Sequence, residues 1–145
     1  MKKVILFLGV FVFLSTGLNA EVIGESKSSG FMLKDTITVN AEDDPDYLGI
    51  VCYTTSIELG GLNFENPSDS SIACRLVGDI SSKKLVDKRN VFVHSKNPFF
   101  KKLVVDRFYD KRRNVLVYLS YTKKMSGKNS SHSISVVPLG DKIKK

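Results

Sequence analysis

The stretch FFKKLVVDRFYDKRRNVLVYLSYTKK, Phe99–Lys124, decides the fold, because it holds two runs of strand-forming residues around a short polar loop. The runs Leu103–Tyr109 and Val115–Tyr121 are rich in branched and aromatic residues, as strands are. Asp110 and Asn114 bound the loop, and asparagine tolerates the positive φ that such turns often require. We therefore predict an antiparallel hairpin. Its second run is apolar on both faces and should be covered on both sides.

The rest of the chain repeats this pattern of short apolar runs between turn residues. Helix-period stretches with capping residues are nearly absent. We predict an all-β or β-dominated fold: a single antiparallel β-sandwich or partly open barrel, with at most short helical turns and one disulfide. We expect Glu21–Gly30 to be a mobile lead-in and Ser81–Lys88 to be a helical turn or loop. The further predicted strands are Asp35–Glu42, Tyr47–Ile57, Ser70–Ile80, Asn90–Ser95 and Ser133–Leu139.

The first twenty residues have the build of a secretory signal peptide. Lys2 and Lys3 precede an apolar core, Val4–Leu14, which is followed by Ser15-Thr16-Gly17 and by a small residue, Ala20, at the expected cut. Eleven apolar residues form a helix of only about 16 Å, too short for the roughly 30 Å hydrocarbon core of a bilayer. We predict cleavage after Ala20, and a mature product, Glu21–Lys145, that is one domain without a transmembrane segment.

The two cysteines are interpreted in the light of this predicted export. Cys52 and Cys74 are the only pair, and an oxidising compartment allows them to join. The sharper alternative, a redox-active pair, lacks the C-x-x-C spacing that lowers a thiol pKa. Two distant cysteines and two scattered histidines also make a poor zinc site. We predict a structural disulfide, no metal site and no cofactor.

Charge is divided unevenly along the chain. The whole chain carries +7, but residues 21–80 hold 3 basic and 11 acidic groups and residues 81–145 hold 17 basic and 4 acidic groups. The simpler interpretation is attraction between the two halves, and the alternative is a basic face for an anionic partner. Nucleic acid is a poor partner for an exported protein, so we expect an envelope anion or a periplasmic protein.

An acidic cluster lies at the end of the first predicted strand. Asp43, Asp44 and Asp46 surround a proline, and such residues terminate strands and form turns. The spacing lacks the glycine turn and terminal glutamate of a calcium loop. We interpret the cluster as a turn, with weak cation binding and acid–base catalysis as alternatives.

Three residues of the hairpin are further structural or ligand-binding candidates. Arg107 lies inside a strand run beside Asp106 and near Tyr109, and a buried arginine must be paired. We expect it to bind an acidic residue of the first half of the chain. Arg113 belongs to the cationic loop, which is either a solvated strand end or part of an anion-binding face.

Catalysis finds little support in the sequence. The chain has no G-x-S-x-G elbow and no phosphate-binding glycine loop. A hydrolase would require Asp43, Asp44 or Asp46 to meet His94 or His132 in one pocket. We therefore predict no catalytic residues and keep the hydrolase as a secondary hypothesis.

A series of blocks in the same order resembles the CreA family of small bacterial periplasmic proteins. The blocks are DDPD, VCY, GGL, SD..IAC, VG, FK.LVV.RFYD..RN.L.YLSY.K and SISVVP, and they span roughly Asp43–Pro138. The resemblance implies a Gram-negative periplasm and makes Cys52 and Cys74 the family's cysteine pair. The region 61–68 is shorter than in the family pattern, and 81–97 carries no recognised motif.

The resemblance supplies no catalytic residues, because the family has no established biochemical activity. We expect a non-enzymatic binding or accessory role in the envelope. The family's name reflects a genetic association with carbon-source-responsive regulation. That association makes a protein-interaction component of envelope or carbon-source signalling the first alternative.

Overall fold

The predicted hairpin is present as β6 (Lys101–Asp110) and β7 (Val115–Lys124), which pair in register along their whole length. The computed structural model of the chain describes residues 20–28, 34–58, 70–80, 84–95, 101–124 and 131–140. The turn at 111–114 closes the hairpin, and Asn114 has a φ of 50°. The left-handed conformation expected of an asparagine in this loop is confirmed.

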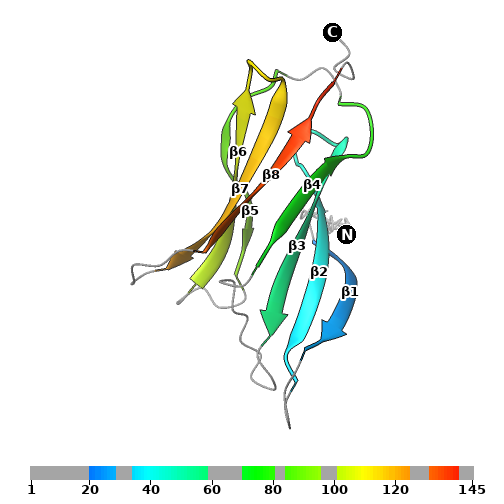
Figure 1. Cartoon of the computed structure of the whole chain (residues 1–145), viewed down its shortest axis with the longest axis vertical. Helices are drawn as coiled ribbons and strands as arrows, with labels where there is room; N and C mark the ends of the chain where they lie inside the picture. The colour runs from blue at the N-terminus through cyan, green and yellow to red at the C-terminus, as the bar shows by residue number, and fades with distance from the viewer. Residues whose placement is uncertain are drawn as a thin grey trace, which may run out of the picture.

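In the described part of the chain, eight strands form two four-stranded antiparallel sheets, in the orders β1-β2-β3-β4 and β5-β6-β7-β8 (Figure 1). This confirms the predicted all-β fold; the strands described here do not close into a barrel. The described residues contain no helix, and hence none that could cross a bilayer. The other strands are β1 (Glu21–Lys27), β2 (Thr36–Asp43), β3 (Ile50–Glu58), β4 (Ile72–Leu76), β5 (Lys88–His94) and β8 (His132–Pro138).

The expectation that Glu21–Gly30 is a mobile lead-in is wrong for most of its length. Residues 21–27 form β1, which pairs with β2 at the edge of the first sheet. Almost all of β1 is exposed, so its residues need not alternate between apolar and polar. The alternation of apolar and polar residues by which the other strands were predicted is therefore missing from β1. Residues 84–87 are irregular rather than helical, and 81–83 lie outside the described residues.

The inner faces of the two sheets pack against each other. The core between them is apolar along one part of its length and polar along another. The apolar part joins the two sheets. It contains Tyr47, Ile50 and Cys52 from the β2–β3 turn and β3, and Leu116 and Tyr118 from β7. Further along the same inner faces the buried residues carry hydroxyl groups. They are Thr38, Thr54, Ser120 and Thr122. Because Glu42 lies opposite Cys52 in the register, β2 turns its polar side inward.

The disulfide joins β3 to β4 inside the first sheet. Cys52 and Cys74 are directly opposite in the register and are bonded to each other, as predicted. Cys74 also contacts the edge of the second sheet, because it hydrogen-bonds to Ser135 of β8. The Ser135 Oγ accepts a hydrogen bond from the Cys74 N–H at 2.7 Å and donates to the Cys74 carbonyl at 3.3 Å. The two sheets thus meet along β4 and β8 (Figure 1).

Candidate functional site

The acidic cluster forms a turn between β2 and β3, and Asp44 organises that turn. Its Oδ1 accepts the backbone N–H groups of Asp46 and Tyr47 at 2.9 and 3.1 Å. This is the local bond by which aspartate stabilises turns. The turn also requires glycine at position 49, because a Cβ there would lie only 2.8 Å from the carbonyl oxygen of Asp79. The interpretation of the cluster as a turn agrees with this geometry.

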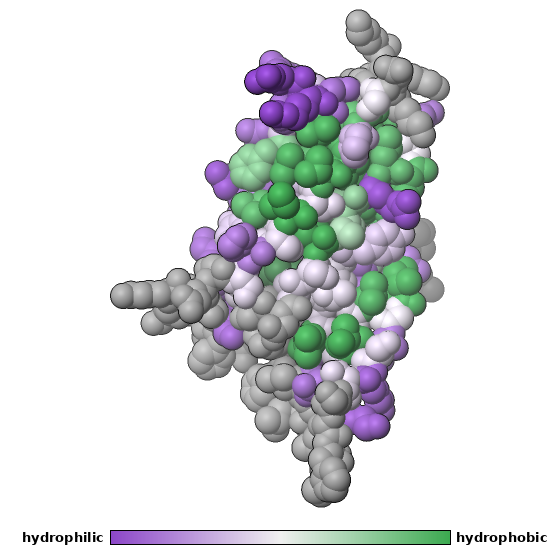
Figure 2. All heavy atoms as spheres, viewed as in Figure 1, coloured by the Kyte–Doolittle hydropathy of each residue, from purple (hydrophilic) through white to green (hydrophobic). Residues whose placement is uncertain are grey.

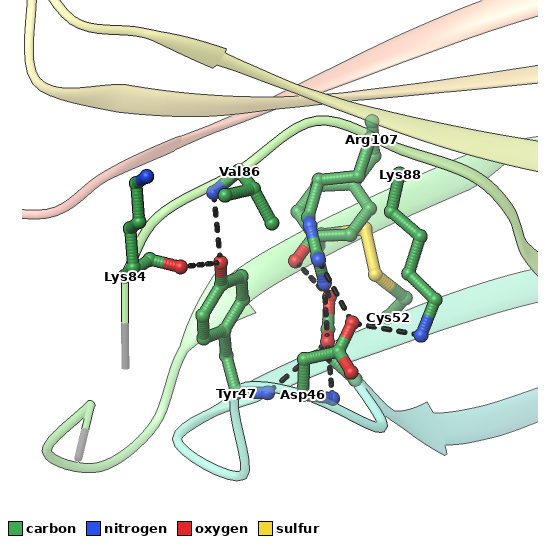
Figure 3. A network of polar contacts seen from close by, with 10 residues as sticks. Asp46, Tyr47, Cys52, Lys84, Val86, Lys88 and Arg107 are labelled. Carbon is green, nitrogen blue, oxygen red and sulfur yellow. Dashed lines mark hydrogen bonds and ion pairs between the residues drawn. A yellow bond between two sulfur atoms is a disulfide. The ribbon is translucent and has the colours of Figure 1, made fainter. Parts of the chain in front are cut away.

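Arg107 links this turn to the second sheet. Its Nη1 donates to both carboxylate oxygens of Asp44 at 2.5 Å, and its Nη2 donates to Oδ2 of Asp46 at 2.9 Å (Figure 3). The Asp44 and Arg107 side chains have 0% exposure. The guanidinium carbon lies 4.2 Å from the centre of the Tyr47 ring, within the range of a cation–π contact. Arg107 therefore pairs with acidic residues of the first half, as expected.

Tyr118 and Lys88 complete the polar network. The Tyr118 hydroxyl donates to Oδ2 of Asp44 at 2.6 Å, and Lys88 Nζ lies 2.8 Å from Oδ2 of Asp46. The Tyr47 hydroxyl accepts the N–H of Val86 at 3.1 Å and donates to the carbonyl of Lys84 at 3.0 Å (Figure 3). Arg107 Nε is buried and has no hydrogen-bond partner among the described residues.

Protonation states in this network are fixed by burial and by the neighbouring charges. Burial, followed by the Asp44 carboxylate, raises the pKa of the Tyr118 hydroxyl, which therefore stays a neutral donor. Burial opposes the charged form of Arg107, but the hydrogen bonds and charge of Asp44 outweigh it and raise the pKa of the guanidinium. The Lys88 ammonium lowers the pKa of Asp46. Together these charged and hydroxyl groups cross-link the turn between β2 and β3 to the second sheet.

A family model described as "CreA protein" matches residues 23–142 of this chain. The chain is also 33% identical over 150 residues to "Protein CreA" of Escherichia coli strain K12, with 95% of each chain covered. The proteins of the same name from E. coli strains O6:H1 and O157:H7 match equally well. The chain belongs to the CreA family. No solved structure matches it.

Membership of the CreA family gives the network a simple description in sequence terms. Asp44 and Asp46 come from the DDPD block, while Arg107 and Tyr118 come from the block that contains RFYD and YLSY. These two blocks of the CreA resemblance, about 60 residues apart, meet through the bonds of Asp44 with Arg107 and Tyr118. The contacts therefore explain why an acidic turn and an arginine-bearing strand occur together in this chain.

A second buried carboxylate of this CreA-family chain lies on the outer face of β6. Asp106 has 0% side-chain exposure and accepts hydrogen bonds from Arg89 Nη1 at 2.6 Å and from the Asn90 N–H at 2.8 Å. Asn90 has a φ of 53° and lies where the pairing of β5 with β6 is irregular. Burial alone would raise the pKa of Asp106, but these donors outweigh it, so that the pKa lies below its usual value.

Acidification is expected to destabilise the fold through Asp106. The pKa of Asp106 is lower in the folded protein than in the unfolded chain, where an aspartate carboxyl has a pKa of about 3.9. The ionised carboxylate therefore stabilises the fold fully at pH values above the unfolded-state pKa. This stability is lost as the pH falls through the lower folded-state pKa. Urea unfolding at a series of acidic pH values measures the loss, and Asp106→Asn should make the curve flatter in this range. The same slope in Asp106→Asn and the unsubstituted protein would contradict the assignment.

The structure separates the other candidate residues. Asp43 is exposed at the end of β2, and Arg113 pairs with Asp110 across the hairpin turn, Nη1 to Oδ2, at 2.8 Å. The Tyr109 hydroxyl donates to Asn114 at 3.2 Å and supports the same turn. None of these three residues has a contact with the Asp44–Arg107 pair among the bonds described.

The two histidines occupy different places. His94 Nε2 lies 2.5 Å from Oε1 of Glu42, and His132 is exposed at the start of β8. The hydrolase hypothesis paired a histidine with one of the cluster's aspartates, whereas both carboxylate oxygens of Asp44 are bound to Arg107. Among the described residues, no group of three or more histidine, cysteine, aspartate or glutamate side chains could hold a metal ion.

Sequence reasoning missed Tyr118, Tyr47, Lys88 and the Arg89–Asp106 pair. A signal was available for Tyr118, because a hairpin closed by a four-residue turn, 111–114, pairs Asp110 with Val115 and therefore Arg107 with Tyr118. A tyrosine opposite a buried arginine in a hairpin is a natural member of the same polar network. No comparable signal existed for Tyr47 or Lys88, whose positions depend on how the two sheets pack.

Proposed function

We propose that this CreA-family chain is exported through a cleaved leader, Met1–Ala20, and that Glu21–Lys145 is its single mature domain. In the Gram-negative periplasm it would act as a non-enzymatic binding or accessory protein. The observation that carries the proposal is the disulfide between Cys52 and Cys74. Disulfides persist in oxidising compartments and are rare in reducing ones.

The start of β1 supports the same proposal. The first strand begins at Glu21, the residue that follows the expected cleavage site, and Glu21 pairs with Ala41 of β2. Cleavage after Ala20 would therefore leave the whole strand in the mature protein. The leader carries the charged start and the short apolar core of secretory signals.

The non-enzymatic part of the proposal rests on the state of the buried charges. Asp44 and Arg107, the most deeply buried charged residues of the site, bind each other, and they also bind Tyr118 and Asp46. A general acid or base needs a pKa near the working pH and access to substrate. Asp44 and Arg107 have no exposed side-chain surface, so binding through the outer surface is the better-supported role.

Purification from the envelope of the native host tests this proposal directly. We expect an N-terminus at Glu21 and the intact mass of the oxidised form. A protein that retains Met1–Ala20 or carries two free thiols would overturn export. A thermal-shift panel of envelope anions and sugars tests the binding role separately, since a ligand at 100 times its dissociation constant adds about 2.7 kcal/mol to the free energy of unfolding.

A further inference from the structure

The outer face of the β5–β8 sheet exposes apolar side chains. Along β8, Val137 is buried in the core, whereas Ile134 and Val136 are 62% and 48% exposed. The register places Leu119 and Val117 of β7 beside Ile134 and Val136, on the same side of the sheet. Figure 2 shows apolar side chains gathered over β7 and β8 below the hairpin turn. We call this the apolar face; it consists of Val93, Phe108, Val117, Leu119, Ile134 and Val136.

The acidic residues on this side of β6 are already neutralised within the chain. Asp106 is bound by Arg89, whose guanidinium carbon also lies 5.0 Å from the centre of the Phe108 ring. Asp110, at the end of β6, is bound by Arg113. The face therefore presents no uncompensated negative charge from these two aspartates.

Exposed cations lie at both ends of the apolar face. Lys111 and Arg112 are exposed in the hairpin turn at one end. At the other end Lys102 and Lys123 are exposed and lie opposite each other in the register, on the same side of the sheet as the apolar face. Strand geometry separates the two cationic ends by about 27 Å, at roughly 3.3 Å per residue.

We propose that this apolar face docks onto the surface of an anionic lipid bilayer. Apolar side chains flanked by lysine and arginine are the arrangement by which proteins lie in a membrane interface. The exposed members are aliphatic, a class that is under-represented among the residues that dominate protein–protein binding. The cations are exposed at the two ends rather than gathered in one pocket, which matches a surface of many phosphates better than a single carboxylate.

The inference deepens the proposed envelope role and rests on export, because an exported protein meets the outer leaflet of the inner membrane. The two proposals can fail independently. An N-terminus at Glu21 tests export by itself, whereas vesicle binding by that processed protein tests the docking surface. The processed protein also lacks the apolar stretch Val4–Leu14, which would otherwise enter vesicles on its own.

Vesicle flotation with the processed protein tests the docking surface. We expect it to float at low salt with vesicles of phosphatidylethanolamine and phosphatidylglycerol and to stay in solution with phosphatidylcholine alone. Lys111→Gln with Arg112→Gln should lower the partition coefficient roughly thirtyfold, because each cation near an anionic surface contributes about 1 kcal/mol. Lys27→Gln with Lys34→Gln changes the net charge equally, at the end of β1 and just before β2, and should have little effect.

Apolar variants separate docking from mere charge attraction. Ile134→Ser with Val136→Ser should lower binding several-fold, whereas Val22→Ser, at an equally exposed valine of β1, should not. The proposal is overturned if the unsubstituted protein fails to float with the anionic vesicles, or if both control variants weaken binding as much as the face variants. It is also overturned if Ile134→Ser instead abolishes a dimer seen by analytical ultracentrifugation, because the face would then bind a second copy.

Discussion

Arg107→Met is expected to lower the free energy of unfolding by about 3–5 kcal/mol, because it leaves the buried carboxylate of Asp44 without its charge partner. Methionine keeps much of the arginine's volume, so the loss reports the missing charge more than an empty space. A loss of that size is a large share of the roughly 5–15 kcal/mol that stabilises a typical domain. Urea denaturation followed by circular dichroism measures it.

The control for this prediction is the second arginine–aspartate contact of the hairpin. Arg113→Met breaks an ion pair whose arginine side chain is 67% exposed, and it should change stability little. Adding Asp44→Asn to Arg107→Met should recover part of the loss, since asparagine keeps an oxygen for the turn and removes the unpaired charge. Equal losses from Arg107→Met and Arg113→Met would show that Arg107 is not a buried cross-link.

Removal of the disulfide is expected to cost about 3 kcal/mol. The bond closes a loop whose ends are 22 residues apart, and the chain-entropy model gives this magnitude for such a loop. Cys52→Ala with Cys74→Ala should lose more than this, because Cys52 has 0% exposure and both sulfur atoms belong to the core.

Reduction of the unsubstituted protein isolates the covalent contribution. Urea unfolding with and without reductant should show the loss of about 3 kcal/mol, since the reduced thiols still occupy the core. The double alanine variant should be insensitive to reductant. The same midpoint for the reduced and the oxidised protein would contradict a stabilising role for the bond.

The hairpin was predictable because its information is local. β6 and β7 pair over ten residues each, and Asn114 has the left-handed conformation that its type favours. The disulfide could be predicted for a different reason: the sequence has only two cysteines, and the predicted leader would bring them to an oxidising compartment. Neither inference required knowledge of how the sheets pack.

β1 and the orientation of β2 lie beyond the reach of local patterns. β1 is an exposed edge strand without alternation, so its pairing with β2 is the only feature that marks it as a strand. In β2, the sequence offers Ile37 and Val39 as an apolar side, yet Thr38 and Glu42 face the core. The polar inner side of β2 meets a polar side chain of the second sheet, since Glu42 Oε1 lies 2.5 Å from His94 Nε2 of β5.

The candidate site shows the same division between local and long-range information. The need for a partner of Arg107 follows from its place inside a strand, and the excess of acidic residues in the first half shows where to look. The choice of Asp44 and Asp46 depends on a contact across 61–63 residues, which only the packing of the sheets determines.

Two of the four edge strands, β1 and β5, have an irregular backbone, while the other two, β4 and β8, lie against each other. This irregularity has a consequence for behaviour at high concentration. The register of β1 shifts between Val22 and Gly24, and that of β5 shifts between Lys88 and Phe92, where Asn90 is left-handed. A straight, regular border would offer a row of free amide and carbonyl groups to another extended polypeptide, and the result is fibrillar growth. Kinks in β1 and β5 hinder such growth, so the molecule can expose aliphatic side chains on one flank without polymerising strand by strand.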